Sequence, residues 1–235
     1  MAILMAADTV SHALAIKLVD NITYDPVSDF TPITMLFTIP SLLAASSTLS
    51  VKSVAELVEL AKQKPGGLTY ASQGNGSAGH VLGVLFQNAV GVPMRHVPYR
   101  GAGPAMPDLV SGRVDFIFST RGSLQAFVDS DQLRILATAT PNRDGNIPSL
   151  SEAGFPHVHY VAWFGLVGPA NLPPTVSKVL QERSVGALNS PDVLETMKRN
   201  GLPPFPTTSE RMREMIQSDI KRLGTIVPDI LRTTN

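Results

Sequence analysis

The chain contains no cysteine, and its 19 lysine and arginine residues balance its 19 aspartate and glutamate residues. The missing thiols exclude disulfides, thiolate catalysis and cysteine-ligated metal, and they fit an oxidising compartment. The net charge of zero, without a lysine or arginine block along the chain, leaves no basic field for nucleic acid or anionic lipid. We therefore expect neither a nucleic-acid partner nor direct insertion into a membrane.

The sequence also lacks any apolar run that approaches the roughly 20 residues needed to span a bilayer. Its first residues, MAILMAADTVSHALAIKL, are apolar, but Asp8 comes early and no lysine or arginine precedes Lys17. A signal peptide needs a basic start, an apolar centre and a small-residue cleavage site, so this segment is not one. The pattern predicts a strand over residues 2–7 that runs directly into a helix, as if an upstream segment were missing.

What the chain does have is 235 residues with 43% hydrophobic content, enough for one large domain or two small ones. Between residues 50 and 140, helical patterns alternate with four apolar segments: LTYAS, MRHVPY, VDFIF and LRILATAT. Because these segments are apolar throughout, they predict a parallel sheet covered on both faces. We expect one doubly wound α/β unit here.

The remainder of the chain predicts a second domain built from two separate segments. An apolar strand, VAWFGLVGP, precedes three helices, which start at Pro173-Pro174, at Ser190-Pro191 with Ser190 as N-cap, and near a Thr207…Glu210 capping box. These helices need a sheet to cover, and the N-terminal piece supplies it. The predicted domains are residues 1–45 with 160–235, and residues 46–159.

Residues 74–79, GNGSAG, fit the pattern G-x-G-x-x-G between a strand and an amphipathic helix. Backbone amides and the positive end of the helix dipole converge at such a loop, which therefore suits an anion. A turn that merely needs small residues is the alternative. Ser72, Asn75, Ser77 and His80 favour a ligand site, because they place several uncharged polar groups around one helix start.

A dinucleotide site is a second interpretation of the same loop. It needs an acidic residue about 20 residues further on for the ribose hydroxyls, and this chain has Tyr99-Arg100 there. Arg100 suits a 2′-phosphate, so an NADP-dependent oxidoreductase stays an alternative. A P-loop is not supported, because His80 stands where the lysine is required.

The sequence shows no constellation for catalysis or metal binding. His157 and His159 share one side of a predicted extended segment, but no third ligand is near. We therefore expect a binding protein that uses no metal or cofactor, and not an enzyme. Tyr99 ends the second apolar strand of the α/β unit, and open α/β sheets bind ligands at strand ends, so we expect Tyr99 to face the ligand.

Five stretches occur in a specific order and spacing: YASQGNGSAGH, HVPYRGAGPAMPDLVSGRVDFIF, LRILATAT, PSLSEAGFP and WFGLVGPANLP. Over essentially the whole chain they resemble the receptors of tripartite tricarboxylate transporters, the Bug family of periplasmic binding proteins. The resemblance implies a type II-like fold of two α/β domains, with parallel or mixed sheets, flanking helices and a cleft between the domains. It also implies a periplasmic receptor that captures a small carboxylate for membrane permease subunits. Backbone amides, small polar side chains and ordered water would hold the ligand.

The chain departs from this family at two places. The family's signal peptide, first strand and first glycine-containing loop would lie upstream of Met1, and Asp8-Thr9 resembles a later loop that faces the cleft. After VDFIF the family often has Asp-Ser, whose carboxylate meets the amino group of amino-acid ligands, whereas this chain has Ser119-Thr120. We therefore expect a di- or tricarboxylate or hydroxy acid. The predicted ligand-binding residues are Asp8, Thr9, Ser72, Gly74, Asn75, Gly76, Ser77, Ala78, Gly79, His80, Tyr99, Ser119, Thr120 and Arg121.

Overall fold

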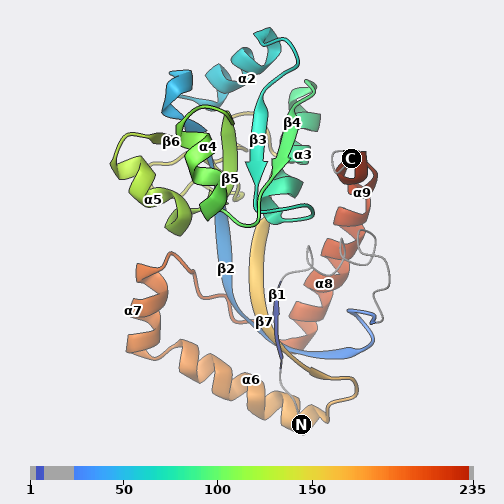
Figure 1. The fold of residues 1–235 in the computed structure, drawn as a ribbon. Helices are drawn as coiled ribbons and strands as arrows, with labels where there is room; N and C mark the ends of the chain where they lie inside the picture. The colour runs from blue at the N-terminus through green and yellow to red at the C-terminus, as the bar shows by residue number, and fades with distance from the viewer. Residues whose placement is uncertain (1–3, 8–23, 233–235) are drawn as a thin grey trace. The chain divides into compact units, whose positions relative to one another are not determined.

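The structure is a computed structural model that describes residues 4–7 and 24–232 (Figure 1). Its contacts divide the chain into two compact units, Met1–Ile39 with Ala162–Val227 and Pro40–Val161 with Pro228–Asn235. We call these unit 1 and unit 2. The domain bounds expected from the sequence, 1–45 with 160–235 and 46–159, stay a prediction.

Unit 1 carries the strand order β1-β7-β2, with β1 (Leu4–Ala7) antiparallel to β7 (Val161–Pro169). β1 lies within the strand expected over residues 2–7, and the helix expected after it falls outside the described residues. The long strand β2 (Phe30–Ser46) contributes its first part to this unit.

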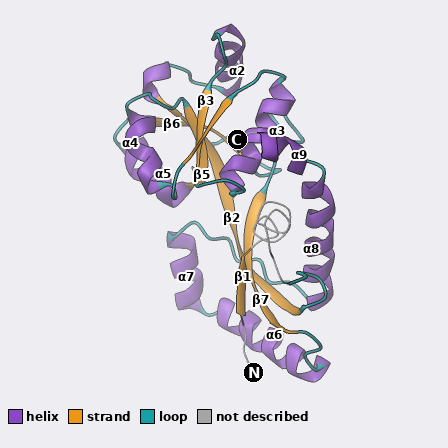
Figure 2. Ribbon diagram, turned by 45° about the vertical axis from the view of Figure 1, so that its right-hand side comes forward, coloured by secondary structure: helices purple, strands orange, loops and turns teal. Residues whose placement is uncertain are grey.

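Four helices follow β7: α6 (Pro174–Leu188), α7 (Pro191–Arg199), α8 (Ser209–Gly224) and α9 (Val227–Arg232), of which nearly all of α9 belongs to unit 2. The sequence predicted three, so α9 was missed. α8 runs alongside β7 (Figure 2) and packs its Met212 and Ile216 against Met35, Trp163 and Val167. This cluster is the core of unit 1.

Two helix starts differ from the expected caps. The N-cap of α8 is Thr208, whose Oγ1 accepts from the Arg211 amide at 3.1 Å, while Thr207 instead bonds the Met35 amide. Thr207 is therefore used to join α8 to β2. Ser190 stands at the N-cap position of α7 as expected, but its hydroxyl donates to the Ala187 carbonyl at 2.7 Å rather than capping the helix.

Unit 2 holds the second part of β2 together with β3 (Thr69–Ser72), β4 (Arg95–Pro98), β5 (Phe116–Thr120) and β6 (Leu133–Thr138). β3 pairs parallel with both β4 and β5. β2 lies antiparallel between β5 and β6, so the four predicted strands point the same way but do not form one all-parallel sheet. The sheet is mixed.

Helices cover both faces of these strands. A short η3 (Gly103–Ala105), α4 (Met106–Val110) and α5 (Arg121–Asp129) pack with Ile117 and Leu42 in one cluster. The rings of Phe116 and Phe118, which alternate with Ile117 along β5, meet Phe86 of α3 (Ala78–Val90) on the other face. The described part of unit 2 also contains η2 (Ser47–Leu49) and α2 (Val54–Gln63).

Candidate functional site

The loop between β3 and α3 is held by two glycines with positive φ, Gly74 at 131° and Gly76 at 75°. Residues with a side chain rarely adopt these angles, so the path of the loop depends on glycine. Ser77 is the N-cap of α3, and its Oγ accepts from the His80 amide at 3.3 Å. Its own amide donates to the Gly74 carbonyl at 3.1 Å. The sequence therefore builds a tight, preformed entry into the helix.

The loop amides divide into two groups. Gly74 donates to Ser72 Oγ at 3.2 Å, Gly76 donates to His80 Nδ1 at 3.0 Å, and the amides of Ser77 and His80 are bonded as just described. Within the described part of the chain, no acceptor is in hydrogen-bonding range of the amides of Asn75, Ala78 and Gly79. Such donors at a helix start suit an anion.

A second helix starts beside the first. Thr120 ends β5 and is the N-cap of α5, with its Oγ1 accepting from the Ser123 amide at 3.4 Å. The amides of Arg121 and Gly122 find no acceptor among residues 4–7 and 24–232. Because β3 and β5 are parallel neighbours, α3 and α5 begin at the same edge of the sheet. The side chain of Gln73 links the two ends, donating to the Phe118 carbonyl at 2.9 Å.

Ser119 and Arg121 lie at this second helix start but in different surroundings. Ser119 is 3% exposed, and in the described part of the chain no group bonds its hydroxyl. Arg121 is paired with Asp144 at 2.6 Å, and both side chains are partly exposed. The arginine that the sequence offered as a ligand contact is therefore already neutralised.

Ser72 and Tyr99 turn their polar atoms toward the protein. The hydroxyl of Ser72 donates to the Gly74 carbonyl at 3.0 Å and lies 2.6 Å from His96 Nε2. The Tyr99 hydroxyl donates to Asp108 Oδ2 at 2.8 Å. Burial, followed by the contact with Asp108, raises the pKa of Tyr99 to about 12. Both residues stand beside the loop, and their hydroxyls are engaged within unit 2.

His80 is fully buried, and its ring stacks on that of His96 with centroids 3.8 Å apart and planes 7° apart. Burial first, and the neighbouring His96 second, lower the pKa of His80 to about 3. His80 is therefore neutral at physiological pH. Sequence reasoning singled out His80 but missed His96, because nothing in MRHVPY marks one residue of a short strand as a ring partner.

The predicted site residues that the structure describes lie in three places. Those from Ser72 to His80 run from the end of β3 through the loop to the first turn of α3, and Ser119, Thr120 and Arg121 lie at the adjacent helix start. Tyr99 lies directly after β4, and its amide donates to the Ser72 carbonyl at 3.0 Å. Asp8 and Thr9 lie outside the described residues.

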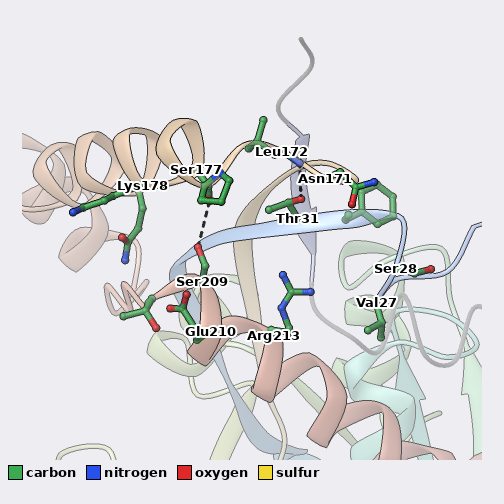
Figure 3. Close-up of a pocket in the computed structure, with 14 residues that line it drawn as sticks. Val27, Ser28, Thr31, Asn171, Leu172, Ser177, Lys178, Ser209, Glu210 and Arg213 are labelled. Carbon is green, nitrogen blue, oxygen red and sulfur yellow. Dashed lines mark hydrogen bonds between the residues drawn. The ribbon is translucent and has the colours of Figure 1, made fainter.

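Unit 1 contains a hollow of its own, with a volume of about 640 Å³, between the start of β2, α6 and the start of α8 (Figure 3). Lys178, Glu210 and Arg213 line it, and no ion pair within the described residues engages them. Ser177 and Ser209 lie beside them with their hydroxyls 3.4 Å apart.

Among the described residues there is no cluster of three histidine or acidic side chains that could hold a metal ion. His159 is engaged with the Pro156 carbonyl through Nδ1 at 2.9 Å. No helix in the described part of the chain has the length and apolar character to cross a membrane.

Comparison with known proteins places the chain in a recognised group. The model of the tripartite tricarboxylate transporter family receptor matches residues 1–231. A protein from the tcbD-tcbE intergenic region of Pseudomonas sp. (strain P51) is 28% identical over 219 residues, which are 92% of this chain and 65% of that protein. Protein BugT of Bordetella pertussis is 28% identical over 228 residues, 96% of this chain and 70% of that one. The chain thus spans about two thirds of the length of these relatives.

Solved structures show the same fold. Rpa4515 of R. palustris with adipate is 27% identical with a TM-score of 0.82, covering 97% of this chain and 77% of that one. MatC from Rhodopseudomonas palustris with bound malate is 25% identical with a TM-score of 0.79, covering 96% and 78%. The predicted two-domain α/β fold of periplasmic binding proteins is confirmed.

Proposed function

Because the chain belongs to the tripartite tricarboxylate transporter receptor family, we propose that it is a periplasmic receptor for a small organic acid, held by one carboxylate at the starts of α3 and α5. The observation that carries this proposal is the pair of adjacent helix starts in unit 2. Their first-turn amides, at Ala78 and Gly79 and at Arg121 and Gly122, have no acceptor within the described residues. A carboxylate oxygen supplies that acceptor.

The known ligands of the solved relatives support the ligand class. Adipate and malate, bound by Rpa4515 and MatC, both carry two carboxylates. At the α5 helix start, the hydroxyl of Ser119 suits a carboxylate or hydroxyl of such an acid. A cationic amino group would find no carboxylate at that position. We therefore propose a di- or tricarboxylate or hydroxy acid rather than an amino acid.

The proposal extends to the rest of the transport step. A receptor of this family delivers its ligand to membrane permease subunits, which are the partners that we propose for this chain. The NADP-dependent oxidoreductase interpretation has no support from the family or from the solved relatives. A family of transporter receptors needs no catalytic group at the glycine loop.

Two matched glycine variants test the site. Gly76 and Gly91 have similar positive φ angles, 75° and 71°, so alanine strains the backbone at both positions to a similar extent. Gly76 lies in the ligand loop, whereas Gly91 ends α3 at the other end of the helix. In calorimetric titrations with malate, adipate, succinate and citrate, we expect Gly76→Ala to lose at least about tenfold in affinity and Gly91→Ala to bind like the unmodified chain.

The alternative outcomes are informative. If both variants bind equally well, the carboxylate does not sit on this loop. If no acid binds the unmodified chain but NADPH protects it in a thermal-shift assay, the receptor proposal fails and the oxidoreductase interpretation returns.

A further inference from the structure

The start of α3 has the geometry of a capping box with histidine in the place of glutamate. In a capping box the N-cap hydroxyl accepts from the third helical amide, and the third side chain accepts from the amide of the N-cap residue. In the variant seen here, the third side chain accepts instead from the amide of the residue before the N-cap. Here Ser77 Oγ accepts from the His80 amide, and His80 Nδ1 accepts from the Gly76 amide at 3.0 Å. This shifted box is completed without a carboxylate, because the Ser77 amide donates to the Gly74 carbonyl and His80 takes the amide one residue earlier.

The same chain contains this shifted box with a carboxylate at the third position, at the start of α2. At the start of α2, Ser53 Oγ accepts from the Glu56 amide at 3.2 Å, and Glu56 Oε2 accepts from the Lys52 amide at 2.7 Å. Lys52 precedes its N-cap by one residue, as Gly76 precedes Ser77. The two helix starts therefore use one arrangement and differ in the charge of the third side chain.

The charge of the side chain at the third helical position determines whether the helix start can bind an external anion. A carboxylate at the third position occupies the positive end of the helix dipole and repels a second anion there. A neutral imidazole completes the same hydrogen bonds and leaves the dipole uncompensated. The amides of Ala78 and Gly79 then remain available for an external carboxylate.

His80 has surroundings that keep it neutral. Its ring is fully buried and lies 3.8 Å from the ring of His96 on β4, which in turn stacks on Tyr70 of β3 at 5.0 Å. Because the charged form of His80 would be buried from solvent against another imidazole, protonation is unfavourable. Protonation at Nδ1 would also remove the acceptor of the Gly76 amide. The hydrogen-bond partners assign the neutral tautomer with an unprotonated Nδ1.

We propose that His80 is a positioning residue and a determinant of anion binding: it completes the capping box of α3 through the Gly76 amide without adding a negative charge, which reserves the helix start for the ligand's carboxylate. The claim that His80 affects ligand binding rests on the proposed function. The claim that His80 holds the Gly76 amide rests on the contacts of His80 alone.

Two isosteric variants separate charge from packing. Glutamine and glutamate both reach back as capping-box residues and both remove the imidazole, so His80→Gln and His80→Glu lose the same ring contacts. We expect His80→Gln to bind malate or adipate within about threefold of the unmodified chain and His80→Glu to lose at least about tenfold at pH near 8. Affinity of His80→Glu should recover as the pH is lowered and the new carboxyl is protonated. Glu56→Gln is the control at α2 and should not change acid binding.

The Gly76 amide provides a measurement that needs no ligand. Its hydrogen exchange, followed by NMR, should be slow in the unmodified chain and in His80→Gln, and fast in His80→Phe, which keeps a ring but has no acceptor. Equal acid affinity of the Gln and Glu variants would overturn the charge argument. Loss of binding in His80→Gln with a protected Gly76 amide would show that the imidazole itself contacts the ligand. If no acid binds the unmodified chain, the proposed function fails while the exchange comparison still decides the positioning role.

Discussion

Two glycines of α3 are required by close contact rather than by a turn. A Cβ on Gly79 would lie 2.8 Å from the Phe118 carbonyl oxygen and 2.5 Å from Gln73 Oε1. A Cβ on Gly83 would lie 2.1 Å from Tyr70 Cε2. Because neither glycine has a side chain, α3 packs closely against β3 and β5. This close packing places the first turn of α3 beside the end of β5.

The contact of Gly83 predicts a change in stability. Gly83→Ala forces the fully buried Tyr70 ring to move, and such overpacking costs about 1–3 kcal/mol or more. Gly186→Ala is the matched control, because Gly186 also lies inside a helix but its Cβ would meet nothing within 4 Å. We expect that control to gain about 0.5–1 kcal/mol from helix propensity. Urea unfolding curves compare the two, and equal effects would contradict the close approach.

The position of Ser119 predicts that the chain binds dicarboxylates and hydroxy acids more tightly than amino acids. Its buried position makes an introduced charge costly and places that charge at the second helix start. We expect Ser119→Asp to weaken binding of malate or succinate by at least about tenfold, because a like charge faces the anion. Ser119→Asn introduces a neutral side chain of nearly the same size as aspartate, so this variant should keep most of the affinity for malate or succinate.

Competition titrations with amino acids check the same prediction. Malate or succinate should outcompete aspartate and glutamate in the unmodified chain. If aspartate or glutamate binds more tightly, the assignment of Ser119 to a carboxylate or hydroxyl partner is wrong.

At the scale of elements, the helices and strands of unit 2 follow from local patterns. The Ser53 and Glu56 box starts α2, Gly91 ends α3 with φ of 71°, and four apolar runs become β3 to β6. β2 was missed because Pro32 and Pro40 interrupt its pattern and proline has no amide for a sheet. In the structure, the pairing with β5 and β6 lies after Pro40, from Ser41 to Ser46. Local sequence could not show that one strand serves two units.

The candidate site was predictable as a loop but not in its division of roles. G-x-G-x-x-G between a strand and a helix predicts a candidate anion-binding loop before any contact is known. Which groups are engaged inside the protein depends on partners distant in sequence, such as His96 for Ser72 and Asp108 for Tyr99. The pairing of Arg121 with Asp144 depends likewise on a turn 23 residues away.

That ion pair gives a prediction about α5 as an element. Asp144→Asn removes the negative charge that neutralises Arg121 at the helix start, so affinity for a dicarboxylate should rise. Because both side chains are 40–46% exposed, we expect an increase of only about two- to fivefold, reduced by salt. Asp129→Asn is the control, since it removes the same charge at the opposite end of α5. A similar gain in both variants would indicate a general charge effect, and a loss in Asp144→Asn would mean that Asp144 holds the site in shape.

At the scale of the whole molecule, the two units should respond differently to acid. Unit 2 contains His80, His96, His157 and His159, whereas the described residues of unit 1 contain no histidine. The single tryptophan, Trp163, lies in the core of unit 1. Its fluorescence therefore reports on one unit, and amide exchange in α3 reports on the other.

The pKa of His80 fixes the sign and the range of this response. Burial, and secondarily His96, lower its pKa from 6.5 to about 3, so between these values the unfolded chain binds a proton that the folded chain does not. The stabilising contribution is therefore complete above pH 6.5 and is lost progressively as the pH falls toward 3, with a slope of at most about 1.4 kcal/mol per pH unit. Hydrogen bonds lower the pKa of Asp108 and Glu152 below their ordinary values of 3.8 and 4.5, so the stability that these carboxyls contribute is lost only below about pH 4.5.

We expect unit 2 to lose stability between about pH 6.5 and 4.5, measured by urea unfolding with amide exchange in α3. The Trp163 transition should change less over the same range. His80→Gln removes the titrating group and should flatten the pH profile of unit 2, while His157→Gln, an exposed histidine, should leave the profile as it is. If the stability of unit 2 falls equally steeply with pH in His80→Gln, another titratable group causes the acid sensitivity. The buried, neutral His80 would then not account for the pH dependence of unit 2.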